Sequence, residues 1–143
     1  MSEGSSPMHW VSVAGAIVDD QNRVLAIRRR DNHHWEPPGG ILETDESIHD
    51  GLVREIKEET DLTVRPTALS GVYKNMARGI VALVFNCEVV SGQPSPTQEA
   101  VEVRFLTANE ISKLMDEAYA CRLLDGLQPG VAIRSHDGVA LID

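Results

Sequence analysis

The alternation of apolar runs with short polar segments predicts two pairs of β-strands. Residues Val11–Val18 are almost wholly apolar, Asp19–Asn22 has the composition of a turn, and Val24–Ile27 is apolar again. Two apolar runs around a polar turn are typical of a β-hairpin. Further along, Leu62–Tyr73 and Ile80–Val90 have the same character and flank a second turn.

Between these pairs the pattern changes to the period of an α-helix. Residues 46–60 contain no proline, and Ile48, Leu52 and Ile56 recur at every fourth position. At about 100° per residue these side chains form one stripe, which must face a core. We expect an amphipathic helix here.

The C-terminal third is predicted to contain a loop, a strand and a helix. Residues 91–97 include two prolines and predict a loop, and Val101–Leu106 predicts a short strand. Thr107 and Glu110 have the spacing of a capping box, which opens a helix. Three roles are open for the tail Val131–Asp143: a further strand, a cover over a cleft, or a contact with a second subunit.

The length of 143 residues favours a single domain, and no repeat or linker divides the chain. We expect a flexible N-terminus at residues 1–8 and one domain at residues 9–143. The first residues lack the pattern of a signal peptide, and no apolar run is long enough to predict a membrane span. Cys87 and Cys121 are isolated, which predicts neither a disulfide framework nor a zinc site. We expect a reduced, cytoplasmic setting.

The formal net charge of −9 disfavours binding to a nucleic-acid polymer, whose backbone is also negative. Most of this charge lies in residues 43–61, which hold eight carboxylates and two basic side chains, a net charge of −6. On the predicted helix, Glu55 and Glu59 fall beside or within the apolar stripe and Glu58 on its flank. Carboxylates gathered at the edge of a core repel one another, and a divalent cation would relieve that repulsion.

A rigid segment, Trp35-Glu36-Pro37-Pro38-Gly39-Gly40, precedes the acidic helix. Proline restricts the backbone, and a glycine pair lets the backbone approach a ligand or metal closely. Beside an acidic helix, this segment favours a binding site over an ordinary turn.

The segment and the helix together resemble the Nudix box of the Nudix (MutT-type) hydrolases. That motif is Gly, five residues, Glu, seven residues, and then Arg-Glu-aliphatic-any-Glu-Glu-any-Gly-aliphatic. Gly40, Glu46 and residues 54–62 match it at every position except one, because Asp61 stands where the family has glycine. Asp tolerates the left-handed conformation that ends many helices, so we expect the end of the helix to be preserved.

The resemblance implies the Nudix fold: an α/β/α sandwich of the α+β class, with a mixed β-sheet and a loop–helix–loop catalytic segment, over about residues 9–125. It also implies hydrolysis of a diphosphate bond with Mg²⁺ or Mn²⁺. The implied metal ligands are Gly40, through its carbonyl, and Glu55, Glu58 and Glu59. Arg54 would orient a carboxylate, and Glu46 would support the loop.

Many members of the family add a glutamate from a later loop, as a ligand or as the general base. Glu99 and Glu102 are both candidates, and Glu99 is favoured because it lies six residues before Phe105. Glu55 and Glu99 both remain candidates for the base, because a metal-bound water is already acidic.

Three positions are candidates for substrate binding. The run Arg28-Arg29-Arg30 ends the second strand, where alternation of faces separates Arg29 from its neighbours, and the resemblance favours Arg29 as the phosphate contact. The alternative is a basic strand end that discourages aggregation. Trp35 would stack on a base or ribose, or else belong to the core, and Gly39 would bring backbone to the ligand.

Other polar and aromatic residues carry less information. Tyr73 and Arg78 are further candidates for substrate contact. His33, His34 and His49 lack the spacing of metal ligands, so we interpret them as structural or surface residues.

The leading hypothesis is a metal-dependent hydrolase of a small nucleotide-type substrate, either a (d)NTP as in MutT-like enzymes or ADP-ribose or a nucleotide sugar. The alternative of a different class is a Nudix-fold sensor that binds a nucleotide without cleaving it. Since such sensors commonly lose glutamates of the box and this chain keeps them, turnover is favoured. The hypothesis includes no membrane partner, and a homodimer is compatible with it.

Overall fold

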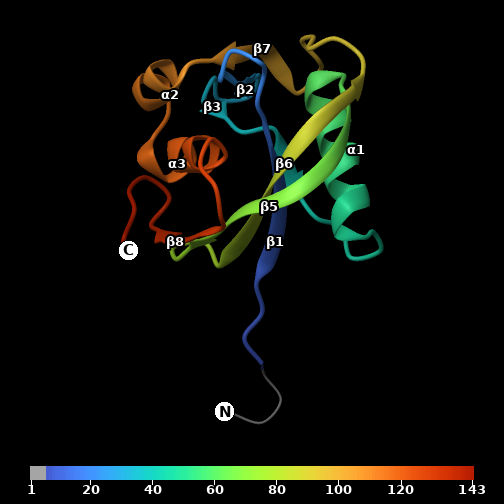
Figure 1. Ribbon diagram of the computed structural model, residues 1–143. Coiled ribbons are helices and arrows are strands. Elements are labelled where there is room, and N and C mark those ends of the chain that lie inside the picture. The colour runs from blue at the N-terminus through green and yellow to red at the C-terminus, as the bar shows by residue number, and fades with distance from the viewer. Residues whose placement is uncertain (1–5) are drawn as a thin grey trace.

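The computed structural model describes residues 6–143 (Figure 1). The predicted flexible segment, residues 1–8, lies largely outside the described residues, and residues 6–9 have no regular secondary structure. The elements in chain order are β1 (Trp10–Ile17), β2 (Val24–Arg29), β3 (Trp35–Glu36), β4 (Gly39–Ile41), α1 (Ile48–Thr60), β5 (Thr63–Asn75), β6 (Ile80–Ser91), β7 (Ala100–Leu106), α2 (Ala108–Leu114), α3 (Glu117–Asp125) and β8 (Ala132–His136).

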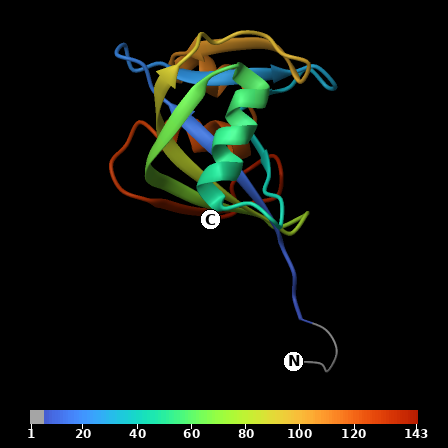
Figure 2. The same ribbon diagram turned by 90° about the vertical axis from the view of Figure 1, so that its right-hand side faces the viewer.

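The strands form two sheets between layers of helices. A five-stranded sheet has the order β4-β1-β6-β5-β8 and is mixed, because β1 runs parallel to β6 and β5 runs parallel to β8. A three-stranded antiparallel sheet has the order β3-β2-β7. Figure 1 shows α1 on one side of the larger sheet and α2 and α3 on the other, and Figure 2 shows α1 lying across its face. The predicted α/β/α sandwich with a mixed sheet is confirmed.

The alternation of side chains along β1 supplies both cores. Val13 packs in one cluster with Leu52 and Ile56 of α1. The next residue, Ala14, packs in the other cluster with Leu123 of α3. Full burial of a leucine- or isoleucine-sized side chain contributes about 1.5–3 kcal/mol. The sheet is therefore fixed between the helices from both faces.

The predicted hairpin of the first two strands is wrong in its pairing. The turn is present, with Asn22 in the left-handed region at φ 60°. However, β1 and β2 lie in different sheets, and the strand pairing between them in the described residues is limited to the isolated bridge between Val18 and Val24. Both edges of β1 are already occupied, by β4 on one side and β6 on the other.

Helix α1 begins slightly later than predicted and buries a shorter stripe. Ser47 is its N-cap and accepts a hydrogen bond from the Asp50 backbone N–H. Leu52 and Ile56 are fully buried, whereas Ile48 is 41% exposed, so its assignment to the core stripe is wrong. Ile48 is the first residue of the helix and does not belong to the core cluster that contains Leu52 and Ile56.

Asp61 ends α1 in the left-handed conformation, at φ 65° and ψ 12°, and its backbone N–H donates to the Lys57 carbonyl. The sequence prediction for this position is confirmed.

We expect Asp61→Val to lower the free energy of unfolding by about 1–2 kcal/mol, because a β-branched residue is strained at positive φ. Urea denaturation checks this. Asp61→Asn is the control, since the substitution removes the exposed ion pair with Lys57 while asparagine tolerates the left-handed conformation. An equal loss of unfolding free energy in Asp61→Asn would contradict the conformational explanation.

The strand and the helix predicted in the C-terminal part are present, and the structure adds elements that were not predicted, both there and around the two prolines. The capping box of Thr107 and Glu110 is present and opens α2. Helix α3 and the short strands β3 and β4, on either side of Pro37-Pro38, were missed. Of the three roles open for the tail, the structure shows a strand, because β8 pairs with β5. Within residues 6–143 no helix is long and apolar enough to cross a membrane.

Candidate active site

Strand β4 fixes the glycine pair against the acidic helix. Gly39 pairs with Ala14 of β1, and its backbone N–H donates to the Glu59 carboxylate at 2.6 Å. A Cβ on Gly40 would overlap the Glu55 carboxylate. The glycines therefore allow the loop to lie directly on two carboxylates of α1.

Arg54 joins the carboxylates of the loop and the helix. Its Nε and Nη2 donate to the two oxygens of Glu46 at 2.9 and 2.7 Å, and its Nη1 donates to Glu55 at 3.0 Å and to Glu58 at 3.3 Å. The hydrogen bonds from Arg54 hold the pKa of Glu46 at about 2. Glu46 also accepts from the Glu43 backbone N–H, which ties the loop to the start of α1.

We expect Arg54→Lys to lower kcat by about 10–100-fold, the usual cost of losing a residue that orients metal ligands. A lysine cannot reproduce two parallel hydrogen bonds to Glu46 while also reaching Glu55. Steady-state kinetics and the metal concentration for half-maximal rate check this. Arg134→Lys is a matched control, because Arg134 makes the same paired contact with Asp125 at 2.8 Å on another element. An equal fall in kcat for both variants would contradict the orienting role.

Three carboxylates converge beside the loop. Single oxygen atoms of Glu55, Glu58 and Glu99 lie within 4.8 Å of one another. Glu55 is half-buried, and burial raises its pKa. Three negative oxygen donors at this spacing repel one another and suit a hard divalent cation such as Mg²⁺ or Mn²⁺. The residues present thus fit the metal that the sequence resemblance implies.

The two candidates in the later loop have different surroundings. Glu99 belongs to the carboxylate cluster, and its backbone N–H donates to the Thr97 hydroxyl at 3.2 Å. Glu102 is turned to other partners, with Arg28 at 3.1 Å and Arg104 at 3.9 Å. The structure therefore brings Glu99, and not Glu102, to the acidic face of α1.

Glu59 lies next to this cluster but outside it. Its side chain is buried, and burial raises its pKa to about 8 although the Gly39 N–H opposes the shift. Glu59 lines the same cavity as Glu55 and Glu99. The hydrogen bond that its carboxylate accepts comes from the backbone N–H of Gly39 in the loop.

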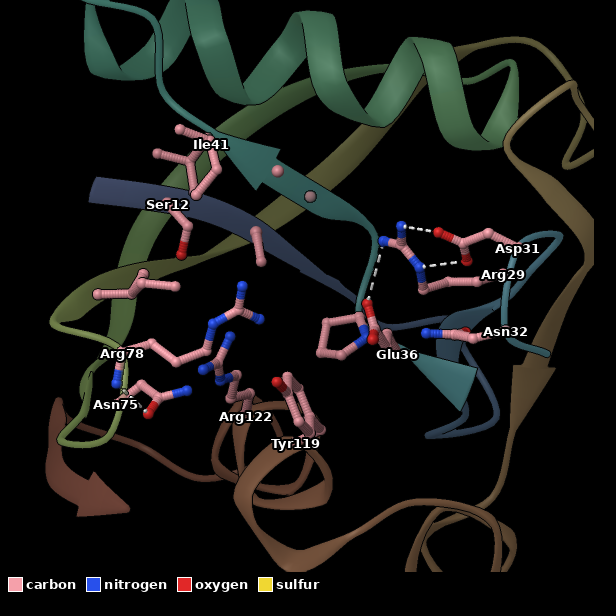
Figure 3. A pocket seen from close by; sticks show the side chains of 16 residues that line it. Ser12, Arg29, Asp31, Asn32, Glu36, Ile41, Asn75, Arg78, Tyr119 and Arg122 are labelled. Carbon is pink, nitrogen blue, oxygen red and sulfur yellow. Dashed lines mark hydrogen bonds and ion pairs between the residues drawn. The ribbon is translucent and has the colours of Figure 1, made fainter. Parts of the chain in front are cut away.

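Two adjoining cavities, of about 630 and 410 Å³, open beside the glycine pair. The larger one holds the acidic end and is lined by Glu55, Glu59 and Glu99 together with Arg30. The smaller one holds Asn75, Arg78, Tyr119 and Arg122 (Figure 3). Residues shared by both cavities are Arg29, Asp31, Gly39, Gly40 and Ile41.

The arginines at the end of β2 do not follow simple alternation. A register shift lies between Arg28 and Arg29, and Arg30 lies beyond the end of β2. Arg29 and Arg30 both line the larger cavity. Arg29 contacts Asp31 at 2.7 Å and Glu36 at 3.5 Å. Strand alternation therefore does not extend to Arg30, because β2 ends at Arg29.

The aromatic candidates lie elsewhere. Trp35 lines neither of the two cavities, and its ring packs under the Arg104 guanidinium at 5.1 Å. Tyr73 is fully buried and donates a hydrogen bond to Asp125 at 2.7 Å. Sequence reasoning missed Tyr119 and Arg122, which carry no motif and reach the cavity only through the packing of α3.

A cluster of carboxylates that suits a divalent cation lies beside a cavity lined by arginines, and this combination is typical of metal-dependent hydrolases of phosphate compounds. The chain belongs to the Nudix family, because the model of the NUDIX domain matches residues 8–124.

Individual relatives agree with this family. A MutT-like protein of Streptomyces ambofaciens is 52% identical over 139 residues, which cover 96% of this chain and 90% of the relative. An ADP-ribose pyrophosphatase of Methanocaldococcus jannaschii is 32% identical over 114 residues, or 75% and 68% of the two chains. The crystal structure of a NUDIX hydrolase from Nitrosomonas europaea matches the fold with a TM-score of 0.78 at 22% identity, over 92% and 82% of the chains. Family and relatives together support a pyrophosphohydrolase.

Proposed function

We propose that this protein is a divalent-metal-dependent hydrolase that cleaves a diphosphate bond in a (d)NTP-like nucleotide or in a nucleoside diphosphate linked to another group. The observation that carries the proposal is the convergence of Glu55, Glu58 and Glu99 beside a cavity that Arg29 and Arg30 also line. Carboxylates alone would repel a diphosphate, and arginines alone would leave no group to accept a proton from water.

Each part of the site has a role in this proposal. Glu55, Glu58 and Glu99 would hold Mg²⁺ or Mn²⁺, with Glu59 and the Gly40 carbonyl as further candidate ligands. When bound, the metal supplies charge neutralisation to the phosphates and acidity to a coordinated water. Glu55 or Glu99 would accept the proton from the attacking water.

The remaining charged groups would position the reactants. Arg29 borders both cavities and would contact the phosphate oxygens. Arg54 would hold Glu55 and Glu58 in orientation through the hydrogen bonds described above. Glu46, anchored by Arg54, would keep the loop against the helix.

A (d)NTP-like substrate is the first choice, because the relative at 52% identity is named MutT-like. Hydrolysis of ADP-ribose is the second candidate, supported by the relative of that name at 32% identity. A sensor that binds without cleavage is disfavoured, since every carboxylate of the box is retained and three of the site's carboxylates converge.

The test is a panel of (d)NTPs, oxidised nucleotides, ADP-ribose and nucleotide sugars, incubated with Mg²⁺, Mn²⁺ or EDTA. A (d)NTP-like substrate is expected to yield a nucleoside monophosphate and pyrophosphate, whereas ADP-ribose would yield AMP and ribose 5-phosphate. Products that form with metal and not with EDTA support the proposal. No metal-dependent product from any diphosphate, with nucleotide binding retained, would establish the sensor instead.

A further inference from the structure

Arg122 is a buried cation that the proposed chemistry does not use. It lies on α3, is only 9% exposed, and lines the smaller cavity. The rings of Tyr119 and Tyr73 lie 4.9 and 5.6 Å from its guanidinium carbon. These contacts fix the side chain in place but supply no negative charge.

Arg122 forms no ion pair with a carboxylate among residues 6–143, and its Nε has no hydrogen-bond partner. Glu36 lines the same cavity and attracts Arg122 electrostatically, but its own ion pair is with Arg29 at 3.5 Å. Burial of an unpaired charge is costly, so such a group in a cavity wall calls for an anionic partner.

The hydrogen-bond contact of Arg122 is with a histidine ring that a second donor also approaches. Its Nη2 lies 3.1 Å from Nε2 of His136, while Nδ1 of the same ring accepts from the Gly138 N–H at 2.9 Å. A neutral imidazole has only one acceptor nitrogen, so it cannot accept from both donors. Burial and the neighbouring Arg122 lower the pKa of His136, which keeps the ring neutral. Arg122 therefore retains donors that need an acceptor.

The neighbours of Arg122 in the cavity are also donors. Asn75 uses its side-chain oxygen for the backbone N–H groups of Ala77 and Arg78, which leaves its NH₂ group free to donate. Arg78 forms no ion pair within the described part of the chain, and it lines the same cavity as Arg122 (Figure 3). Two guanidinium groups and an amide NH₂ thus line the smaller cavity as hydrogen-bond donors.

We propose that Arg122, Arg78 and Asn75 form a second phosphate subsite, which binds a phosphate group of the substrate away from the diphosphate bond that is hydrolysed. This inference rests on the proposed function, because the subsite lies in the cavity that adjoins the acidic cluster through Arg29 and the glycine pair. The substrate class is a nucleotide that carries a phosphate on its ribose in addition to the diphosphate. Phosphate satisfies both requirements of this subsite, since it brings negative charge and several acceptor oxygens.

The first test measures binding without metal, so that it does not depend on hydrolysis. In EDTA, calorimetry compares AMP with adenosine 2′,5′-bisphosphate and adenosine 3′,5′-bisphosphate. Wild type is expected to bind one bisphosphate at least about 10-fold more tightly than AMP, and Arg78→Ala is expected to remove that advantage. Arg65→Ala is the matched control, because Arg65 is an exposed arginine that pairs with Glu88 on other parts of the sheet. Equal affinities for AMP and both bisphosphates in wild type would overturn the proposal.

The buried arginine is tested by Arg122→Met, which keeps the length of the side chain. Arg78→Ala, on an exposed turn residue, gives the answer if the methionine variant fails to fold. If either substitution weakens AMP and the bisphosphates by the same factor, the subsite recognises a neutral edge of the base and the proposal is wrong. If inorganic phosphate binds in an Arg78-dependent manner but neither bisphosphate gains over AMP, the site takes free phosphate and the substrate assignment is overturned.

The second test uses matched substrates, NADPH against NADH and coenzyme A against dephospho-coenzyme A. The phosphorylated member of a pair is expected to have a KM lower by about 10-fold, with a similar kcat. This preference should disappear in Arg78→Ala. Absence of hydrolysis of any diphosphate would refute the proposed function, while the binding result in EDTA would still decide the subsite.

Discussion

Glu58→Gln is expected to lower kcat by about 1000-fold and to leave the fold intact, because a carboxylate at a metal site contributes several kcal/mol to the transition state. The side chain is 44% exposed, and Arg54 is its only ion-pair partner in the described residues. Glutamine has the same shape and keeps an oxygen, but it lacks the charge. Measurements are kcat with the best substrate of the panel, Mn²⁺ affinity, and the urea midpoint.

Glu102→Gln is the matched control for this experiment. Glu102 is 40% exposed and pairs with an arginine at 3.1 Å, so its loss should alter stability by no more than about 0.5 kcal/mol and leave kcat within about 2-fold. A wild-type rate in Glu58→Gln, or a larger loss in Glu102→Gln, would show that the assignment of the acidic cluster is wrong.

Gly39→Ala is expected to cost about 3 kcal/mol of unfolding free energy, at the upper end of the usual range for overpacking. An added Cβ would overlap the Val13 carbonyl oxygen and would lie 2.6 Å from the Ala14 Cα. Both atoms belong to the backbone of β1, which is paired on both edges and cannot move aside. The loop would move instead, and with it the hydrogen bond from Gly39 to Glu59.

A displacement of this kind should also lower kcat by about 100-fold, since an ångström of misplacement at a catalytic site has an effect of that order. Urea denaturation and steady-state kinetics measure the two effects on the same protein. Gly130→Ala is the control: nothing lies within 4 Å of its added Cβ, and its φ of +85° predicts a cost of about 1 kcal/mol without change in kcat. Equal stability of the two variants would contradict the close packing of β4 on β1.

The acidic part of the site could be predicted because its spacing is local. Glu55, Glu58 and Glu59 lie on one helix, so their separation follows from helical geometry, and Arg54 reaches them from the same turn. The left-handed end at Asp61 is likewise a property of a few adjacent residues. The helical period and the box motif thus specify the carboxylates that α1 carries, whereas Glu99 joins the cluster from a later loop.

The rest of the site depends on contacts between distant segments. The position of Arg122 is set by α3 and by His136, which becomes an edge-strand residue only when β8 pairs with β5. The pairing of β1 with β6 instead of β2 is also nonlocal, because both strands have apolar patterns that fit either partner. No periodicity in the chain distinguishes these arrangements.

The opposite charges at the two ends of the joined cavities give the cleft a direction. Carboxylates lie at one end, Arg78 and Arg122 lie at the other, and Arg29 stands between them. An asymmetric molecule with several charged groups has one favourable orientation in such a field, since the reversed one places like charges together. The orientation of the bound substrate in the cleft would thereby determine which of the two phosphorus atoms of a diphosphate faces the attacking water.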